Sequence, residues 1–174
     1  MPEELVTESL VLRKARDEDL EAIWHNVWRD RALAETMLWK PTRTRRQAAE
    51  RLERTKRYQA ENLAWFVCLR SSGEPIGFAG LREIGEGEYE ESGICIARRF
   101  QQKGYGRQVL EALVDLVFNR LNGHLFRYGC FRENEASKAL ALSCGFVYIH
   151  SETLVREWDG HEYLCDFYQL TEKQ

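Results

Sequence analysis

Residues 98–107 read Arg-Arg-Phe-Gln-Gln-Lys-Gly-Tyr-Gly-Arg and combine two glycines with four basic side chains. The apolar spacing that follows predicts a helix, so the segment is a loop that leads into a helix N-terminus. Gly104 and Gly106 would let a ligand approach the main chain, and the unpaired N–H groups of the first helical turn would point at it. An anionic phosphate suits this arrangement. A helix start without a ligand is the alternative, because Gly-x-Gly alone is a weak signal.

The side chains that could act as nucleophiles or metal ligands are scattered along the chain and form no recognisable motif. The five cysteines stand alone in largely apolar contexts without a Cys-x-x-Cys pair, and no histidine lies at metal-ligand spacing. This pattern is typical of reduced thiols in an intracellular protein without a metal ion. Cys144 has no adjacent histidine or basic residue that would activate its thiol, so a packing role is favoured over a nucleophilic one.

The pattern along the chain predicts the elements that must position the loop. Alternation over residues 9–13 predicts a strand, and the acidic residues 17–19 start a helix that carries apolar residues to Trp28. The other predicted helices cover residues 44–60, 104–121 and 134–143, and the other predicted strands cover residues 63–70, 75–84, 88–96, 124–131, 146–150 and 162–170. Consecutive strands followed by alternating helices and strands indicate an α/β or α+β fold around a mixed sheet.

Length and composition exclude several classes of protein. A chain of 174 residues is expected to form one domain, over residues 1–174. Lys and Arg number 25 and Asp and Glu 28, so the net charge of −3 provides no overall basic field for nucleic acid. The N-terminus lacks the features of a signal peptide, and no apolar run approaches the roughly 20 residues of a membrane span. A cytoplasmic protein without membrane contact is therefore expected.

The loop and further motifs together resemble the GNAT superfamily of N-acetyltransferases. Gln-x-x-Gly-x-Gly at residues 101–106 resembles the acetyl-CoA pyrophosphate loop of that family. Asn-x-x-Ser at 134–137, with Gly-Phe at 145–146, resembles its second signature. Residues 7–13 and 75–80 look like the branch that includes ribosomal-protein N-terminal acetyltransferases. The resemblance covers essentially the whole chain.

The resemblance implies a fold and a cofactor site. The fold would be a mixed, mostly antiparallel sheet of about six to seven strands with about four helices, in which two neighbouring strands splay apart to admit acetyl-CoA. The pantetheine arm would pair with the backbone of residues 94–96, and the pyrophosphate would lie on the amides of residues 102–107. The implied cofactor-binding residues, with no metal ion, are Ile94, Cys95, Ile96, Gln101, Gln102, Lys103, Gly104, Tyr105, Gly106, Arg107, Asn134 and Ser137. An ordinary helix N-cap is the other role open to Asn134, and both can hold together.

The reaction that the resemblance implies is direct attack of a neutral primary amine on the acetyl thioester in a ternary complex. A backbone N–H near residues 94–96 would stabilise the oxyanion. Glu90 and Glu91 are the candidate general bases, and strand alternation makes them face opposite ways. By register with the loop, Glu91 resembles the carboxylate of the ribosomal-protein branch and Glu90 that of other members, so Glu91 is slightly preferred. Solubilising an exposed hairpin is the alternative role for both.

One position departs from the family pattern. Many members carry a tyrosine seven residues after the motif asparagine, placed to protonate the leaving thiolate, and this chain has Ala141 there. Tyr163, Tyr168, Tyr105 and Ser137 are candidate replacements, and the thiolate can also leave unaided because the thiol of coenzyme A is fairly acidic. A catalytically weak acyl-CoA-binding or sensor module is therefore a second hypothesis.

The acceptor and the partners are less constrained. Residues 40–57 hold eight Lys and Arg against two Glu, a charge of +6. A solvated helix face is the favoured interpretation, and RNA, the ribosome or an acidic partner are open alternatives, although nucleic acid is not expected. Trp24, Trp28 and Trp39 are expected in the core or along the acceptor groove. The expected acceptor is a protein or peptide N-terminal α-amine or a small amine, polyamines and aminoglycosides included, and the expected state is a monomer or homodimer.

Overall fold

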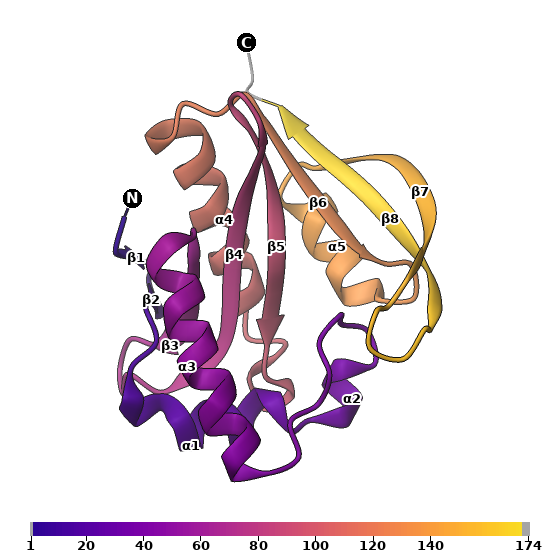
Figure 1. Cartoon of the computed structure of the whole chain (residues 1–174). Coiled ribbons are helices and arrows are strands. Elements are labelled where there is room, and N and C mark those ends of the chain that lie inside the picture. The colour runs from indigo at the N-terminus through magenta and orange to yellow at the C-terminus, as the bar shows by residue number, and fades with distance from the viewer. Residues whose placement is uncertain (1, 172–174) are drawn as a thin grey trace.

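The computed structural model describes residues 2–171, which contain one sheet of eight strands (Figure 1). The strand order is β1-β2-β3-β4-β5-β6-β8-β7, and β5 and β6 form the parallel pair in this otherwise antiparallel sheet. The strands are β1 (Glu4–Val6), β2 (Leu10–Arg13), β3 (Ala64–Leu69), β4 (Pro75–Gly85), β5 (Glu88–Ile96), β6 (Leu125–Phe131), β7 (Val147–Val155) and β8 (Glu162–Thr171). The α-helices of this part of the chain are α1 (Leu20–Ile23), α2 (Arg31–Ala34), α3 (Arg45–Glu61), α4 (Tyr105–Asp115) and α5 (Glu135–Ser143). The predicted mixed, mostly antiparallel fold is confirmed.

Two elements near the N-terminus differ in detail from the prediction. β1 is an additional short strand that pairs with β2 and buries Leu5, so the sheet has eight strands rather than about six to seven. The first predicted helix is divided, because α1 ends at Ile23 and a wider π-type turn covers Trp24–Trp28. α2 then starts where the Asp30 carboxylate accepts the Leu33 N–H at 3.1 Å. This cap stabilises a new helix start that apolar spacing alone does not indicate.

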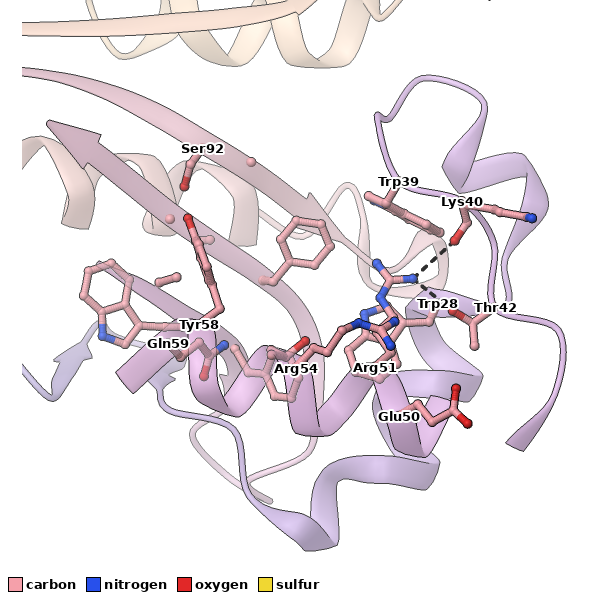
Figure 2. A pocket seen from close by; sticks show the side chains of 18 of the residues that line it. Trp28, Trp39, Lys40, Thr42, Glu50, Arg51, Arg54, Tyr58, Gln59 and Ser92 are labelled. Carbon is pink, nitrogen blue, oxygen red and sulfur yellow. Dashed lines mark hydrogen bonds between the residues drawn. The ribbon is translucent and has the colours of Figure 1, made fainter. Parts of the chain in front are cut away.

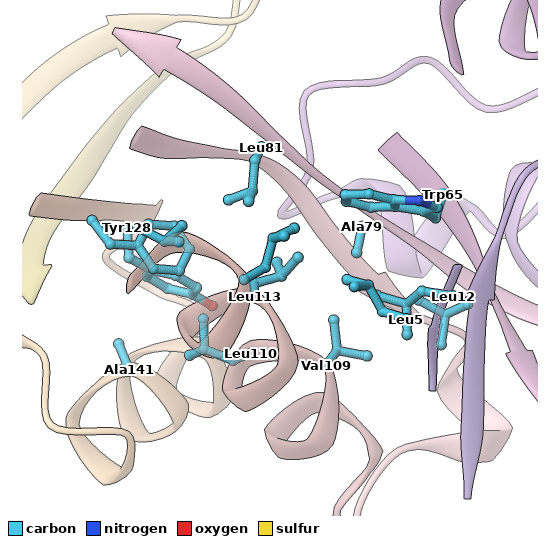
Figure 3. Close-up of a cluster of buried hydrophobic side chains, with 14 of the residues drawn as sticks. Leu5, Leu12, Trp65, Ala79, Leu81, Val109, Leu110, Leu113, Tyr128 and Ala141 are labelled. Atoms are coloured by element: carbon cyan, nitrogen blue, oxygen red, sulfur yellow. The ribbon is translucent and has the colours of Figure 1, made fainter. Parts of the chain in front are cut away.

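The side chains of β3 alternate between two hydrophobic clusters on opposite faces of the sheet. Trp65 and Val67 pack in the cluster that includes α4, and Phe66 and Cys68 pack in the one that includes α3. Figure 3 shows the first cluster, in which α4 side chains such as Leu113 lie against the sheet. Within residues 2–171, no helix combines the length and the apolar composition that a membrane span requires.

The parallel pair, β5 and β6, separates soon after it forms. The strands pair only from Glu88 opposite Leu125 to Glu90 opposite Arg127, although β5 runs on to Ile96. On the β4 side, Gly80 pairs with Gly93 and Leu81 with Glu91, so one residue of β5 forms a β-bulge between them. Figure 1 shows the two strands diverging toward the end of β5. The predicted splayed pair is confirmed, and beyond Glu90 the edge of β5 that faces β6 has no strand partner within residues 2–171.

Candidate active site

Glu91 bridges the gap where β5 and β6 begin to separate. Its carboxylate accepts hydrogen bonds from the Gly93 N–H on β5 at 2.7 Å and from the Gly129 N–H on β6 at 3.4 Å. Burial raises the pKa of Glu91 to about 7, although the two backbone donors act in the opposite direction. A carboxylate whose pKa lies near neutrality is suited to accept a proton from a bound amine.

Glu90 faces the other way, as strand alternation predicts. Its carboxylate forms an ion pair with Arg82 on β4, and the Arg82 Nε donates to the Glu90 Oε2 at 3.1 Å. A carboxylate already held by a guanidinium has less free acceptor capacity than one held only by backbone amides. Of the two candidate bases, Glu91 is the one in the gap.

The β5 residues beyond the bulge present backbone groups to the gap. The Ala97 N–H donates to the Ile76 carbonyl of the β4 side at 2.7 Å. Because N–H direction alternates along a strand, the Ile96 and Ile94 N–H groups point away from β4, toward the gap. The Cys95 side chain packs in the opposite cluster, and burial raises the pKa of its thiol. Residues 94–96 therefore present main-chain donors and acceptors to the gap, while the thiol faces away.

The loop after β5 ends in a set of unpaired amides. Gly104 precedes α4 with φ of 78°, and the first bond of the helix runs from the Gln108 N–H to the Gly104 carbonyl at 3.1 Å. The N–H groups of residues 105–107 consequently have no acceptor within the helix. Gln102 also has a positive φ of 59°, a conformation that turns consecutive amides toward one side. Together these groups form a cradle that could hold an anion at the positive end of the α4 dipole.

The polar side chains of this loop have separate roles. The Gln101 amide donates to the Ile96 carbonyl at 2.9 Å, which ties the loop to the end of β5. Lys103 is exposed beside the cradle, and Arg107 pairs with Glu111 on the next turn of α4 at 2.7 Å. The sequence prediction treated all three as cofactor-binding. In the structure, the backbone supplies the cradle, Gln101 shapes it, and the Lys103 charge is available to a phosphate.

Asn134 and Ser137 lie at the start of α5. The Asn134 side-chain oxygen accepts the Ser137 N–H at 3.1 Å, so the residue is an N-cap and its amide N–H groups remain available. The Ser137 hydroxyl lies 2.6 Å from the hydroxyl of Tyr128 on β6. Ala141, at the position where the family pattern has tyrosine, is buried in the same cluster as Tyr128 (Figure 3).

Sequence reasoning missed Tyr128. Among the tyrosines it considered, Tyr163 stacks on Phe131 at 4.0 Å between ring centroids, and Tyr168 packs against Tyr148. Burial raises the pKa of Tyr128, and the neighbouring Glu91 carboxylate acts in the same direction, so its hydroxyl keeps its proton. The strands last pair at Glu90 and Arg127, so Glu91 and Tyr128 are the next residues along β5 and β6, where the gap opens. This strand register could have pointed to Tyr128, but using it requires knowing that β5 and β6 are neighbours.

A pocket of about 620 Å³ lies on the α3 side of the sheet (Figure 2). At one end it is bounded by Ser92 and Tyr58, and at the other by Trp39, Lys40 and Arg51. Gly93 lines this pocket, and its N–H binds the Glu91 carboxylate in the gap. The pocket and the gap therefore meet at the β-bulge of β5. The remaining lining residues are Trp28, Pro41, Thr42, Gln47, Glu50, Arg54, Thr55, Gln59, Ala64, Trp65, Phe66, Phe78, Ala79 and Gly80.

The thiols do not form part of this constellation. All five cysteines are unpaired, and burial raises the pKa of the Cys144 thiol. A raised pKa leaves less of the nucleophilic thiolate, which supports a packing role for this residue. In the part of the chain that the structure describes, no three His, Cys, Asp or Glu side chains gather in an arrangement that could hold a metal ion.

Comparison with known proteins gives the family. Residues 9–147 match the family model described as acetyltransferase (GNAT) domain. The N-alpha-acetyltransferase RimI of Mycobacterium tuberculosis is 32% identical over 84 residues, 47% of this chain, and the match spans about half (51%) of that relative. The solved structure of RimL, ribosomal L7/L12 alpha-N-protein acetyltransferase, has a TM-score of 0.80 at 20% identity and covers 99% of this chain and 96% of that one.

A further neighbour was solved with the acetyl donor. Microcin C7 self immunity acetyltransferase MccE, in complex with acetyl-CoA and AMP, has a TM-score of 0.80 at 16% identity, with 95% of this chain and 94% of that chain covered. These structures share the fold, and the family match extends over the gap, the loop and the α5 signature. The chain belongs to the GNAT acetyltransferase family, whose members use acetyl-CoA as co-substrate.

Proposed function

We propose that the protein transfers the acetyl group of acetyl-CoA to the α-amine of a protein or peptide N-terminus by direct attack in a ternary complex. The observation that carries the proposal is the meeting of two sites at the β-bulge. The gap offers amides for a phosphorylated thioester, the pocket offers an aromatic-lined space for an acceptor, and Gly93 borders both. The similarity to RimI supports an N-terminal α-amine as the acceptor.

The residues of the gap bind and orient acetyl-CoA. The pyrophosphate lies on the amides of residues 102–107 with Lys103 nearby, and the pantetheine arm pairs with the backbone of residues 94–96. The free amide N–H groups of Asn134 and the Ser137 hydroxyl reach the arm from α5. The unpaired N–H groups of α4 fit this role because a helix N-terminus binds phosphate without any charged side chain.

The reaction needs one proton removed and one supplied. The neutral amine attacks the thioester carbon, its nitrogen forms the new C–N bond, and the C–S bond breaks to release the thiolate. Backbone N–H groups near residue 94 stabilise the oxyanion. Glu91 accepts the proton from the amine nitrogen, and the hydroxyl pair of Tyr128 and Ser137 lies on the β6 and α5 side of the gap to supply one to the sulfur.

An α-amine is the acceptor that this site can best activate. A lysine side chain has an ordinary pKa of about 10.4 against about 7.7–8.0 for an α-amine, a difference that costs about 3.5 kcal/mol more for deprotonation at neutral pH. An α-amine is therefore neutral in a far larger fraction at neutral pH, and Glu91, with a pKa of about 7, stays available to accept the proton that the nitrogen releases on attack. Lysine side chains would require a stronger base than the described gap contains.

The test combines binding with turnover. Saturation with acetyl-CoA at 100 times its Kd should stabilise the fold by about 2.7 kcal/mol, measured as a rise in Tm. Thiol release should then occur with free N-terminal peptides and not with the same peptides carrying a blocked α-amine and one lysine. Stabilisation without thiol release from any peptide, polyamine or aminoglycoside would support the acyl-CoA-binding module instead. No stabilisation at millimolar acetyl-CoA would contradict both.

A further inference from the structure

The far end of the pocket is positively charged. Its lining includes Lys40, Arg51 and Arg54, and Glu50 is the one acidic residue among the lining side chains. Glu50 pairs with Arg46, whose Nε lies 3.2 Å from the carboxylate. Among the described residues, the end of the pocket opposite Ser92 therefore has three cations and one lining carboxylate, Glu50, which is already paired with Arg46 (Figure 2).

Arg51 is held in a fixed plane at this end. Its guanidinium carbon lies 4.7 Å from the ring centroid of Trp28 and 5.1 Å from that of Trp39. Its Nη1 donates to the Thr42 hydroxyl at 3.0 Å and to the Lys40 carbonyl at 3.4 Å, the two bonds drawn in Figure 2. The contacts with two indole rings, together with the two hydrogen bonds of Nη1, orient the guanidinium before any ligand binds. Such preorganisation is expected of a binding group.

Arg51 is partly buried, and its environment differs from that of the two buried arginines, Arg13 and Arg156. Arg13 forms two 2.8 Å bonds with the Asp19 carboxylate, and Arg156 bonds Asp159 at 2.9 and 2.7 Å. Arg51 contacts only the neutral acceptors described above, and burial together with the nearby Arg54 lowers its pKa to about 10. A partly buried charge is normally compensated by a carboxylate, and within residues 2–171 Arg51 has none.

We infer that the acceptor is a primary amine that also carries a carboxylate, with its amine at the Ser92 and Gly93 end of the pocket and its carboxylate on Arg51. This inference rests on the proposed function and specifies its substrate class. A carboxylate matches the planar, forked guanidinium through the Nε and Nη2 donors, for which the described chain provides no acceptor. Lys40 and Arg54 add attraction from the rim. A peptide with an acidic side chain near its N-terminus has both groups.

The same charge pattern disfavours cationic acceptors. A polyamine or aminoglycoside would bring further positive charges next to Arg51, Arg54 and Lys40, and like charges at close quarters oppose binding. Polyamines and aminoglycosides are therefore expected to be poorer substrates than an acidic peptide. Under this inference, the acidic partner considered for the basic segment 40–57 is the acceptor itself.

The experiment uses peptide pairs that differ only in charge. Four-residue peptide amides with a free α-amine carry glutamate at position 1, 2 or 3 and alanine elsewhere, and each has a twin with glutamine. The kcat/KM for thiol release should be at least about tenfold higher for one glutamate peptide than for its twin. In Arg51→Gln the ratio should fall to near one, and Arg51→Lys should retain only part of it. Arg57→Gln, an exposed arginine of α3 outside the pocket, is the matched control and should keep the full ratio.

A binding measurement keeps the inference testable if an Arg51 variant does not fold or if no peptide is turned over. The N-acetylated glutamate and glutamine peptides are titrated into the wild-type protein with coenzyme A present. Tighter binding of a glutamate product supports the inference even without turnover. Equal affinity within about threefold for all three pairs overturns it. Thiol release with equal preference for both members of every pair would overturn the inference while leaving the proposed acetyl transfer intact.

Discussion

The two sides of β5 present different kinds of chemical group to the ligands proposed for them. On the gap side, most of the groups that would face acetyl-CoA are backbone amides: those of residues 94 and 96, and those of the first turn of α4. On the pocket side, they are side chains: Trp39, Arg51 and Phe78 among them. Backbone donors depend on conformation and tolerate many side chains, whereas an aromatic and guanidinium pocket changes with each substitution. The fold can therefore keep one cofactor site while the acceptor site varies.

Glu91 lies where the two sides meet, so its substitution should have the largest effect. Glu91→Gln removes the proton acceptor and is expected to lower kcat about 100-fold or more, because positioned general bases contribute roughly 10²–10⁴. The Kd for acetyl-CoA, measured by titration, should stay nearly unchanged. Glu90→Gln is the adjacent control, since Glu90 pairs with Arg82 outside the gap. A larger loss of kcat in Glu90→Gln than in Glu91→Gln would identify Glu90, on the pocket side, as the general base.

The pH dependence of kcat/KM tests the role of Glu91 independently of how far kcat falls in Glu91→Gln. Glu91 must be ionised to accept a proton, and its pKa is about 7, so activity should fall as pH drops through neutrality. The α-amine also protonates on the way down, so log kcat/KM should rise with a slope of about two below about pH 6 in the wild type. In Glu91→Gln only the amine titrates, and the slope should be about one. A wild-type slope of one would show that Glu91 does not titrate in the reaction.

A glycine pair separates cofactor binding from general strain. Gly104 and Gly73 have φ of 78° and 77°, and a Cβ at either would meet no atom within 4 Å. Alanine at each should therefore cost a similar stability, about 1 kcal/mol for a left-handed conformation. Gly104 lies in the proposed phosphate loop and Gly73 does not, so only Gly104→Ala should raise the KM for acetyl-CoA, by about tenfold. Equal KM values for acetyl-CoA in the two variants would show that the loop at Gly104 does not bind the phosphate groups.

Local features of the site could be predicted from the sequence, and features that join distant segments could not. The loop at residues 98–107 and the Asn134 cap are each built within a few residues, so type and spacing indicate them. The basic segment shows the limit. Its lysines and arginines look alike in sequence, yet Arg45 and Lys56 pair with acidic residues of other segments while Arg51 enters the pocket. The contacts of Arg51 with Trp28 and Trp39 depend on how α3 packs against the chain before it.

Tyr128 offers the smallest effect and the finest test of the gap side. Tyr128→Phe removes the hydroxyl that lies 2.6 Å from that of Ser137 and preserves the packing of the ring against Phe146. Because the thiol of coenzyme A is itself fairly acidic, the loss of one hydrogen-bonding partner should cost about 1 kcal/mol, or roughly fivefold in kcat. The effect should shrink with an acyl donor whose thiol leaves more readily. If kcat falls equally with both donors, the hydroxyl pair shapes the gap without protonating the leaving sulfur, because only a proton donor responds to leaving-group acidity.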